Sequence, residues 1–432
     1  MAPLGPFEPA PRLTVGVSGG ADSLALALLL RGWVGSRGGA LTALVVDHGL
    51  RADAAAEATR ATRILSDMDV TARVLRRRGP CPTANIQAFA RRARYRLMSD
   101  WCARKRVLHL MLAHHLDDQA ETLLLRLARG SGLDGLAAMA PISEQGALRL
   151  LRPLLGLSKA RLEATLAARG ISWIEDPTNR DPAHARVRLR RLWPVLAAEG
   201  LSAARLGAAA GHLARARVAI EAAVARLLAG AATVHPAGFI LLDPVPLGTA
   251  PAEVGLRALS RVLMTVGGAA YGPRMARLQR LHGRILNGPP RAATLGGCRI
   301  VPRGTRLLIV REARATESLP VKPGETVRWD GRFEIAVRVP RGAPRAQRTW
   351  GDLHVSALGA DGWAEVRRAV PAALARAIPA PARASLPAVR DRRGPLLVPH
   401  LGFRNPDDEA LIVAKCRLSP ANGLTGVPFT VA

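Results

Sequence analysis

The chain has 432 residues, 49% of them hydrophobic, so it is long enough for two or three domains with substantial cores. No apolar run near its start approaches the roughly 20 residues of a membrane span, and residues 1–13 lack the basic and apolar regions of a secretory signal. We therefore expect a cytoplasmic protein with no membrane partner. The four cysteines form no CxxC pair, which argues against a zinc ribbon, an iron–sulfur cluster and a disulfide framework: Cys81, Cys102, Cys298 and Cys416.

The net charge of +29, from 62 basic and 33 acidic side chains, favours a polyanionic partner and above all a nucleic acid. Only four of the basic residues are lysine, and Ala and Gly are frequent, so a compositional bias of the genome can explain the choice of arginine. Such a bias does not explain the excess of basic over acidic residues. Aromatic residues make up only 3% of the chain, which disfavours binding mainly by base stacking.

The first half of the chain alternates short apolar strands with amphipathic helices, the pattern of a mostly parallel, doubly wound α/β sheet. Strands are predicted at 13–17, 41–46, 70–75 and 107–112, and helices at 24–30, 52–68, from Thr83 to about Arg104, and at 117–128. Two apolar segments, 148–151 and 171–173, flank a helix opened by Ser158. This pattern predicts an α/β domain over 1–195.

The second half begins with a long Ala-rich pattern, which predicts a connecting helical region over 192–229. Further helices are expected at 253–266 and 273–286, a short apolar stretch at 238–242, and a hairpin over 299–310 that turns at Arg303-Gly304. Short β-like runs such as TVRW and FEIAVRV follow, and the Pro/Ala/Arg stretch 369–388 is expected to be loop or partly disordered. We predict a helical domain over 196–315 and a small α+β domain over 320–432.

A glycine-rich turn, SGGADS, joins the first strand to the first helix. Consecutive glycines allow a tight turn with exposed N–H groups, and a helix N-terminus adds unpaired donors, so the turn predicts a phosphate site. It matches neither GxxxxGK[ST] nor GxGxxG. The carboxylate of Asp22 is explained either by helix capping or by a Mg²⁺ that accompanies a nucleotide. An ordinary capped turn remains the alternative for the whole segment: Ser18, Gly19, Gly20, Ala21, Asp22 and Ser23.

A second polar cluster, AHHLDDQAET at 113–122, follows the fourth predicted strand. It lies at the edge where open α/β sheets bind ligands. Helical spacing lets Asp117, Asp118 and Glu121 converge, although acids in a first helical turn also stabilise the helix dipole. In so basic a chain, a local acidic pocket points to a cationic substrate or a metal ion.

The turn SGGADS resembles the SGGxDS loop of the ATP pyrophosphatases, which cleave ATP between the α and β phosphates. Together with HHLDDQAET, it resembles the tRNA(Ile)-lysidine synthases. Further motifs of that family stand in order along 13–191: VDHGLR at 46–51, ARRARY at 90–95, RGSGLDGLAAM at 129–139, RPLL at 152–155 and EDPTNRD at 175–181. Weaker similarity continues at 295–312 and 322–333.

This resemblance implies an ATP-dependent ligase that joins L-lysine to C2 of the wobble cytidine of an isoleucine tRNA with a CAU anticodon. ATP adenylates the C2 oxygen, and the lysine ε-amine then displaces AMP. The loop would hold the departing pyrophosphate, Asp22 would position Mg²⁺, and Asp118 and Glu121 would bind the lysine. A neighbouring carboxylate would accept the proton of the attacking amine. The oligomeric state is not fixed by the sequence, and a homodimer is kept open.

The resemblance also implies that 1–195 is the PP-loop ATP pyrophosphatase catalytic domain, that 196–315 binds substrate or tRNA and that 320–432 binds tRNA. It assigns further residues outside the two motifs. His48 follows the second strand, where adenine would lie, although a turn-capping role is a close alternative. Arg91 and Arg94 would contact ATP or tRNA phosphate, unless they belong to a solvated basic helix face. Where the family pattern reads RNxxR, this chain keeps both arginines, Arg186 and Arg190, and carries Val187 in place of the asparagine.

Three other functions compete with this one. A tRNA cytidine 2-thiolation enzyme combines a similar loop with an HHxDD-like segment but needs CxxC pairs. Amidotransferase-type synthetases use the loop on small nucleotides, which would explain neither the extra domains nor the charge. A basic RNA-binding protein with a degenerate loop would bind RNA without lysine-dependent ATP cleavage, but every polar residue of SGGADS is present.

Overall fold

The computed structural model separates the chain into two compact units, Met1–Ala219 and Ile220–Val427. The finer division at 1–195, 196–315 and 320–432 stays a prediction. In the described part of the chain, no helix combines the length and hydrophobicity needed to cross a membrane. The structure describes residues 1–49, 53–79, 86–145, 148–175, 181, 183, 185–287, 291–339, 352–406, 412–420 and 422–424.

The first unit is built on a six-stranded sheet in the order β3-β2-β1-β4-β6-β5. All neighbouring pairs are parallel except β5 and β6, which are antiparallel. The predicted mostly parallel α/β sheet is therefore confirmed. Its strands are β1 (Arg12–Val17), β2 (Ala40–Asp47), β3 (Thr71–Arg76), β4 (His109–Met111), β5 (Ile142–Gln145) and β6 (Leu148–Leu151).

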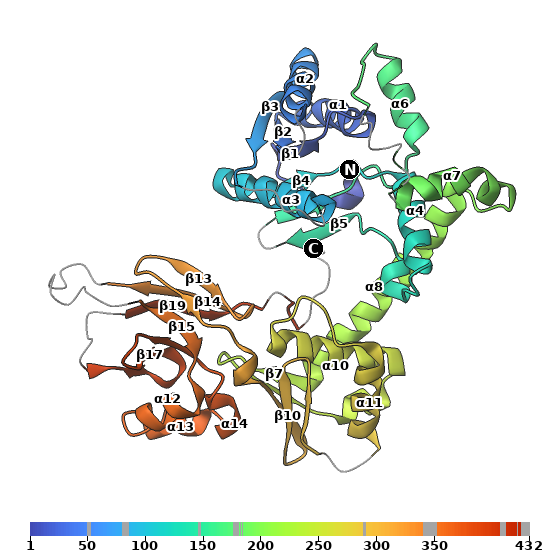
Figure 1. The fold of residues 1–432 in the computed structure, drawn as a ribbon. Coiled ribbons are helices and arrows are strands. Elements are labelled where there is room, and N and C mark those ends of the chain that lie inside the picture. The colour runs from blue at the N-terminus through green and yellow to red at the C-terminus, as the bar shows by residue number, and fades with distance from the viewer. Residues whose placement is uncertain are drawn as a thin grey trace. The chain divides into compact units, whose positions relative to one another are not determined.

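Helices cover both faces of this sheet (Figure 1). Successive strand residues point to opposite faces, and β2 shows it: Ala43 and Val45 join one core, and Leu44 joins the other. The first core includes residues of α1 (Ala21–Gly35), α2 (Ala54–Asp67) and α6 (Lys159–Ala167). The second includes Met98 and Cys102 of α3 (Ile86–Lys105).

Two details differ from the sequence predictions in this unit. The edge strand β5 was not predicted, because its sequence ISEQ has a single apolar residue and so gives no alternating pattern. Residues 171–173 form no regular element, although Ile171 and Trp173 pack on the first core. The expected cap Thr83 lies outside the described residues, whereas Ser158 is the N-cap of α6 as predicted.

The helical region expected over 192–229 is confirmed, and it consists of two helices, α7 (Ala185–Ala198) and α8 (Ala203–Ala231). Gly200 has a φ of +82°, a left-handed conformation that ends a helix. Ser202 then accepts a hydrogen bond from the backbone N–H of Arg205 at 3.3 Å and caps the next helix. The start of α8 packs near α4 (Leu116–Leu127), whereas its end belongs to the core of the second unit.

The second unit begins with a five-stranded sheet, β7-β8-β11-β10-β9, covered by α10 and α11. The predicted hairpin is confirmed as β10 and β11, with its turn at Gly304. The predicted helices at 253–266 and 273–286 are α10 and α11. The bounds are β7 (Ala232–Val234), β8 (Ile240–Leu242), α9 (Val245–Thr249), α10 (Ala252–Gly267), α11 (Met275–Leu286), β9 (Ala293–Leu295), β10 (Cys298–Arg303) and β11 (Arg306–Arg311).

Two further sheets, β13-β14-β19 and β12-β15-β16-β17-β18, make up the rest of the second unit. The runs TVRW and FEIAVRV form β13 and β14, as predicted. The expectation of loop or disorder at 369–388 was wrong, because alanines there form short helices that open after Pro371 and Pro379. The bounds are β12 (Leu319–Pro320), β13 (Thr326–Trp329), β14 (Phe333–Arg338), β15 (His354–Ala357), α12 (Gly359–Val366), α13 (Ala372–Ala377), α14 (Ala380–Arg383), β16 (Pro387–Arg390), β17 (Pro395–Val398), β18 (Phe403–Arg404) and β19 (Ile412–Leu418).

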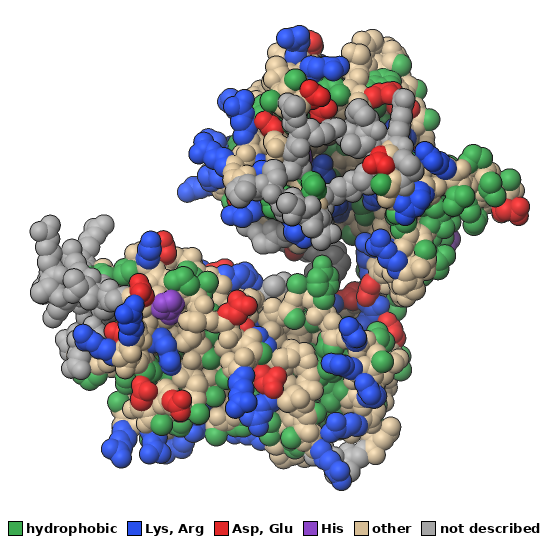
Figure 2. Space-filling model, viewed as in Figure 1, with side chains coloured by type: hydrophobic (Ala, Val, Ile, Leu, Met, Phe, Trp, Pro, Cys, Tyr) green, Lys and Arg blue, Asp and Glu red, His purple; other side chains and the backbone are tan. Residues whose placement is uncertain are grey.

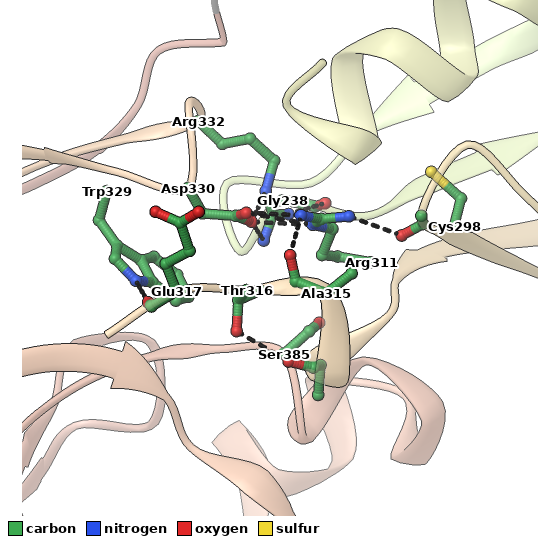
Figure 3. A network of polar contacts seen from close by, with 12 residues as sticks. Gly238, Cys298, Arg311, Ala315, Thr316, Glu317, Trp329, Asp330, Arg332 and Ser385 are labelled. Carbon is green, nitrogen blue, oxygen red and sulfur yellow. Dashed lines mark hydrogen bonds and ion pairs between the residues drawn. The ribbon is translucent and has the colours of Figure 1, made fainter. Parts of the chain in front are cut away.

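A buried ion-pair network joins segments of the second unit that are far apart in sequence (Figure 3). Asp330, in the turn between β13 and β14, accepts hydrogen bonds from Arg311 and Arg332, each with a closest distance of 2.7 Å. Arg311 also donates to the carbonyls of Gly297 and Ala315. None of the three charged side chains is more than 9% exposed. The carboxylate thus compensates two buried guanidinium groups.

We expect Asp330→Asn to lower the free energy of unfolding by about 3–5 kcal/mol, because it leaves two buried cations without a counter-charge. Asparagine accepts the left-handed backbone of position 330, where φ is +51°, so the substitution tests the charge alone. The control is Asp352→Asn, whose carboxylate is 75% exposed and 3.4 Å from Arg392. Its expected effect in denaturant unfolding is below about 0.5 kcal/mol. Equal losses of unfolding free energy in the two variants would contradict the role of Asp330 as the counter-charge of the two buried arginines.

Candidate active site

The two polar motifs meet at the carboxyl edge of the parallel sheet. The chain leaves β1 toward β2 and β3 on one side, and later returns to place β4 on the other side of β1. Such a reversal of strand order opens a crevice in which α/β sheets bind their ligands. The loop 18–20 follows β1, and His114 and His115 follow β4. Both motifs therefore lie at the reversal point.

The loop after β1 is held in shape by its own residues and by one neighbouring segment. The hydroxyl of Ser23 donates to the carbonyl of Gly20 at 3.0 Å and accepts from the N–H of Ser18 at 3.2 Å. The N–H of Ile174 donates to the carbonyl of Gly19 at 2.9 Å. Ser23 thus acts within the loop, and the exposed Ser18 is the more accessible hydroxyl.

The loop ends at the N-terminus of α1, where Gly20 is the N-cap and no side chain caps the first turn. Unpaired N–H groups at the start of a 15-residue helix, together with its dipole, attract an anion. The turn has the features expected of a phosphate-binding loop.

The two loop glycines differ in a way that permits a matched test. Gly19 has a φ of +88°, and a Cβ there would lie 2.7 Å from Cδ1 of Ile174. Gly20 has a φ of −74°, and a Cβ there would meet no atom closer than 3.7 Å. We expect Gly19→Ala to destabilise the protein by about 1–3 kcal/mol and to abolish nucleotide binding. Gly20→Ala should fold normally, as thermal unfolding and ATP titration of both variants would show.

A cavity of about 610 Å³ opens beside this loop. This volume suits a nucleotide, and the wall combines apolar strand residues with a few polar groups. His48, Arg94 and His114 line it, together with Ser18 and Asp22. Arg91 is not among the lining residues, but its guanidinium donates to the hydroxyl of Tyr95, which does line the cavity, at 3.2 Å.

His115 lies between the two motifs and is 3% exposed. Its Nε2 is 3.6 Å from Oδ2 of Asp22 and 3.5 Å from Oδ2 of Asp118. Its Nδ1 is 3.3 Å from Oδ2 of Asp117, which also accepts a hydrogen bond from the backbone N–H of Lys159 at 2.9 Å. One buried imidazole thus contacts three carboxylates.

The two adjacent histidines have opposite protonation tendencies. Burial acts to lower the pKa of His115, but its contacts with Asp117, Asp22 and Asp118 outweigh burial and raise this pKa to about 10. The same contact with His115 lowers the pKa of Asp117 to about 2. Burial, reinforced by Arg152 and other arginines, lowers the pKa of His114 to about 3. At neutral pH, His115 is a cation among acids and His114 is neutral.

The carboxylate of Asp22 keeps one oxygen available. Oδ2 faces His115, whereas Oδ1 is buried and has no hydrogen-bond partner among the described residues. Within the same part of the chain, no group of three His, Cys, Asp and Glu side chains could hold a metal ion by itself. Magnesium is commonly held by one or two carboxylates plus substrate phosphates and water, so the Oδ1 of Asp22 fits such an ion.

Asp118 and Glu121 converge on one side of α4, as their spacing predicted, and both are nearly buried. The guanidinium of Arg190 donates to Glu121 at 2.6 Å, and Arg186 lies 3.7 Å from Glu121 and 3.9 Å from Asp118. Both arginines come from α7, where they share one face. In this structure they pair with the acids, and Val187 between them is buried.

Other residues of the motifs support the local fold. The amide of Gln119 makes two hydrogen bonds with the backbone of Met139, at 2.8 and 2.9 Å. Arg126 donates to the carbonyls of Gly135 and Ala138. These contacts fasten the segment 129–139, including the short helix α5 (Leu133–Leu136), to α4. Most of EDPTNRD lies outside the described residues.

Sequence reasoning placed His115 in the second polar cluster without giving it a role, and it did not single out Tyr95 or Arg152. Tyr95 and Arg152 stand inside the quoted motifs ARRARY and RPLL, and both influence groups of the cavity: Tyr95 lines it, and Arg152 helps to lower the pKa of His114. The doubled histidine before two aspartates was the available signal for His115. Spacing alone could not show that Asp22, from another element, completes its surroundings.

Comparison with known proteins places the chain in a family. A family model described as a PP-loop domain matches residues 2–196. The tRNA(Ile)-lysidine synthase of Ruegeria pomeroyi is 40% identical over 328 residues, which cover 76% of this chain and 77% of that protein. The protein of the same name from Methylobacterium nodulans is 44% identical over 303 residues, which cover 66% and 86%.

A solved structure, the U34-tRNA thiolase NcsA from Methanococcus maripaludis with its [4Fe-4S] cluster, matches 47% of this chain and 72% of its own. Its sequence identity is 16% and its TM-score 0.41. The identity to the curated relatives and its extent along both chains establish the relationship. The chain belongs to the tRNA(Ile)-lysidine synthase family.

Proposed function

We propose that this protein joins L-lysine to C2 of the wobble cytidine in an isoleucine tRNA with a CAU anticodon, using ATP and releasing AMP and pyrophosphate. One observation carries the proposal. A phosphate-binding loop and a buried acidic pair lie so close together that Asp22 and Asp118 contact the same nitrogen of His115. A site that activates an oxygen with ATP and holds a cationic amine beside it needs this arrangement.

In the first step, the C2 oxygen of the cytidine attacks the α-phosphate of ATP, and the bond to the β-phosphate breaks. The N-terminal amides of α1 and the hydroxyl of Ser18 stabilise the charge on the departing pyrophosphate. Asp22 would hold a Mg²⁺ through Oδ1, and that ion would neutralise phosphate charge. His48 and Arg94, in the wall of the cavity, would contact the nucleotide.

In the second step, the ε-amine of lysine attacks C2, and the C2–O bond breaks to release AMP. Asp118 and Glu121 orient the lysine through its ammonium groups. The nucleophilic amine must be neutral, and a carboxylate of this cluster accepts the proton that it loses. Arg186 and Arg190 form ion pairs with Glu121, and we propose that they turn to phosphate from the same face of α7 when the substrates bind.

The tRNA is held chiefly through its phosphates. Lys and Arg side chains are spread over the visible surface of both units, with fewer Asp and Glu (Figure 2). In the first unit, exposed arginines line β3 and the outer face of α3: Arg73, Arg76, Arg78, Arg91, Arg92 and Arg96. Affinity should therefore fall steeply with salt concentration. The substrates place this activity in the cytoplasm.

The direct test measures pyrophosphate release from ATP with lysine and an isoleucine tRNA transcript that carries a CAU anticodon, omitting each component in turn. Release that requires the tRNA, with labelled lysine recovered on it, supports the ligase. Pyrophosphate release that does not depend on lysine would contradict the proposal. It would point to another nucleophile, and a sulfur donor would be tested first. Tight RNA binding without ATP cleavage would point to a binding protein.

A further inference from the structure

We propose that His115 is a positioning residue for both small substrates. Its Nε2 contacts Asp22, which is assigned to ATP binding, and Asp118, which is assigned to lysine binding. The inference rests on the proposed function and assigns a role to a residue that touches neither substrate. It makes a specific claim: disturbing this one side chain weakens two binding sites together.

The first step of the argument is the geometry of the contacted oxygens. His115 meets Asp22 and Asp118 each through Oδ2, at 3.6 and 3.5 Å. The backbone N–H of His115 also donates to Oδ2 of Asp118, at 3.2 Å. The other oxygen of Asp22 has no hydrogen-bond partner among the described residues, and the other oxygen of Asp118 faces Arg186. The imidazole therefore contacts each carboxylate through one oxygen, while the second oxygen of Asp22 is open to a ligand and the second oxygen of Asp118 faces Arg186.

The second step is the anchoring of the ring itself. Nδ1 faces Asp117, and Asp117 is tied to the first residue of α6 through the backbone N–H of Lys159. The ring is almost fully buried, so its orientation is set by these contacts and by packing. Because its Nδ1 side is anchored in this way, the ring can hold in place two acids that come from different helices, α1 and α4.

The third step is a comparison with His109, a second buried histidine, which lies on β4 just before the loop that carries His115. His109 begins β4, is 1% exposed and contacts one acid, Glu8, at 3.2 Å. It lies at the opposite end of β4 from His115 and touches none of the site carboxylates. Replacing His109 therefore perturbs the same unit without touching the site, which makes it a matched control.

The experiment compares His115→Gln and His109→Gln in the complete lysine-ligation reaction. Glutamine can contact one acid but cannot face Asp22, Asp118 and Asp117 at once. We expect His115→Gln to raise the KM for ATP and the KM for lysine, each by about tenfold, with the KM for tRNA unchanged. His109→Gln should leave all three KM values within about twofold of the wild type. Reversible unfolding would raise the apparent KM of every substrate that binds only the folded protein, tRNA included, so an unchanged KM for tRNA separates the expected result from partial unfolding.

Three results would overturn the inference. His115→Gln could lower kcat alone, could raise only one of the two KM values, or could match His109→Gln in all of them. If His115→Gln yields no folded protein, His115→Asn is measured in the same way and judged by the same criteria. If the wild-type protein forms product and His115→Gln has normal KM values, this inference is wrong but the proposed function stands. A wild-type protein that forms no lysine-dependent product removes the proposed function as well.

Discussion

Asp22→Ala is expected to abolish ATP turnover, lowering kcat by a factor of about 10³ or more, and to leave tRNA affinity within about twofold. The side chain lies in the first turn of α1 and presents the buried Oδ1 that is open to a ligand. Removing it takes away the proposed magnesium contact and a carboxylate that faces His115. A single acidic group does not hold a polyanion, so the RNA surface should be unaffected. Pyrophosphate release and filter binding of the tRNA measure the two effects.

The control for this prediction is Asp100→Ala on α3. That carboxylate is 53% exposed and lies 3.8 Å from Arg96, away from the lining of the cavity. We expect normal turnover, with a change in stability below about 0.5 kcal/mol. Loss of RNA affinity in Asp22→Ala with normal ATP turnover would contradict the assignment of the loop.

Glu121→Gln is expected to raise the KM for lysine by a factor of about 100, with the KM for ATP changed far less. Glutamine has nearly the same shape but no charge, and the glutamate is 3% exposed, so its charge is little screened by water. The substitution also leaves Arg190 without its partner at 2.6 Å, which adds a local positive charge that repels the lysine ammonium. Lysine titrations at saturating ATP and tRNA measure this effect.

The matched control is Asp134→Asn, an acid-to-amide change on the neighbouring short helix α5. It should leave the KM for lysine unchanged, because its carboxylate lies outside the acidic pair. If Glu121→Gln lowered kcat and left the KM for lysine intact, the glutamate would act in the chemical step and not in lysine binding. Combining Glu121→Gln with Arg190→Ala would then measure the coupling between the two side chains.

The sequence alone determined the elements whose signals are local. Alternating apolar strands and amphipathic helices predicted the parallel sheet, because side-chain periodicity reports which faces are buried. The loop SGGADS was predicted to be a phosphate site, and its tight turn and helix N-terminus are present, because both depend on a few adjacent residues. The spacing of Asp118 and Glu121 placed both on one side of a helix for the same reason.

The elements that were missed depend on partners distant in sequence. The strand β5 exists because it pairs with β6, not because ISEQ has a strand pattern. The break at Gly200 inside the predicted helical region 192–229 was missed, because a long Ala-rich pattern does not show a left-handed backbone. Short helices at 372–383 form because alanines follow prolines that suit helix starts, although composition suggested disorder.

The site shows the same division. The sequence supplied Asp22 and the acids of α4 as separate motifs, 95 or more positions apart along the chain. Only the tertiary structure brings them to one imidazole and pairs Glu121 with an arginine of α7. Charges that interact over a few ångströms inside a buried site depend on how strands are ordered, and strand order is a property of the whole sheet.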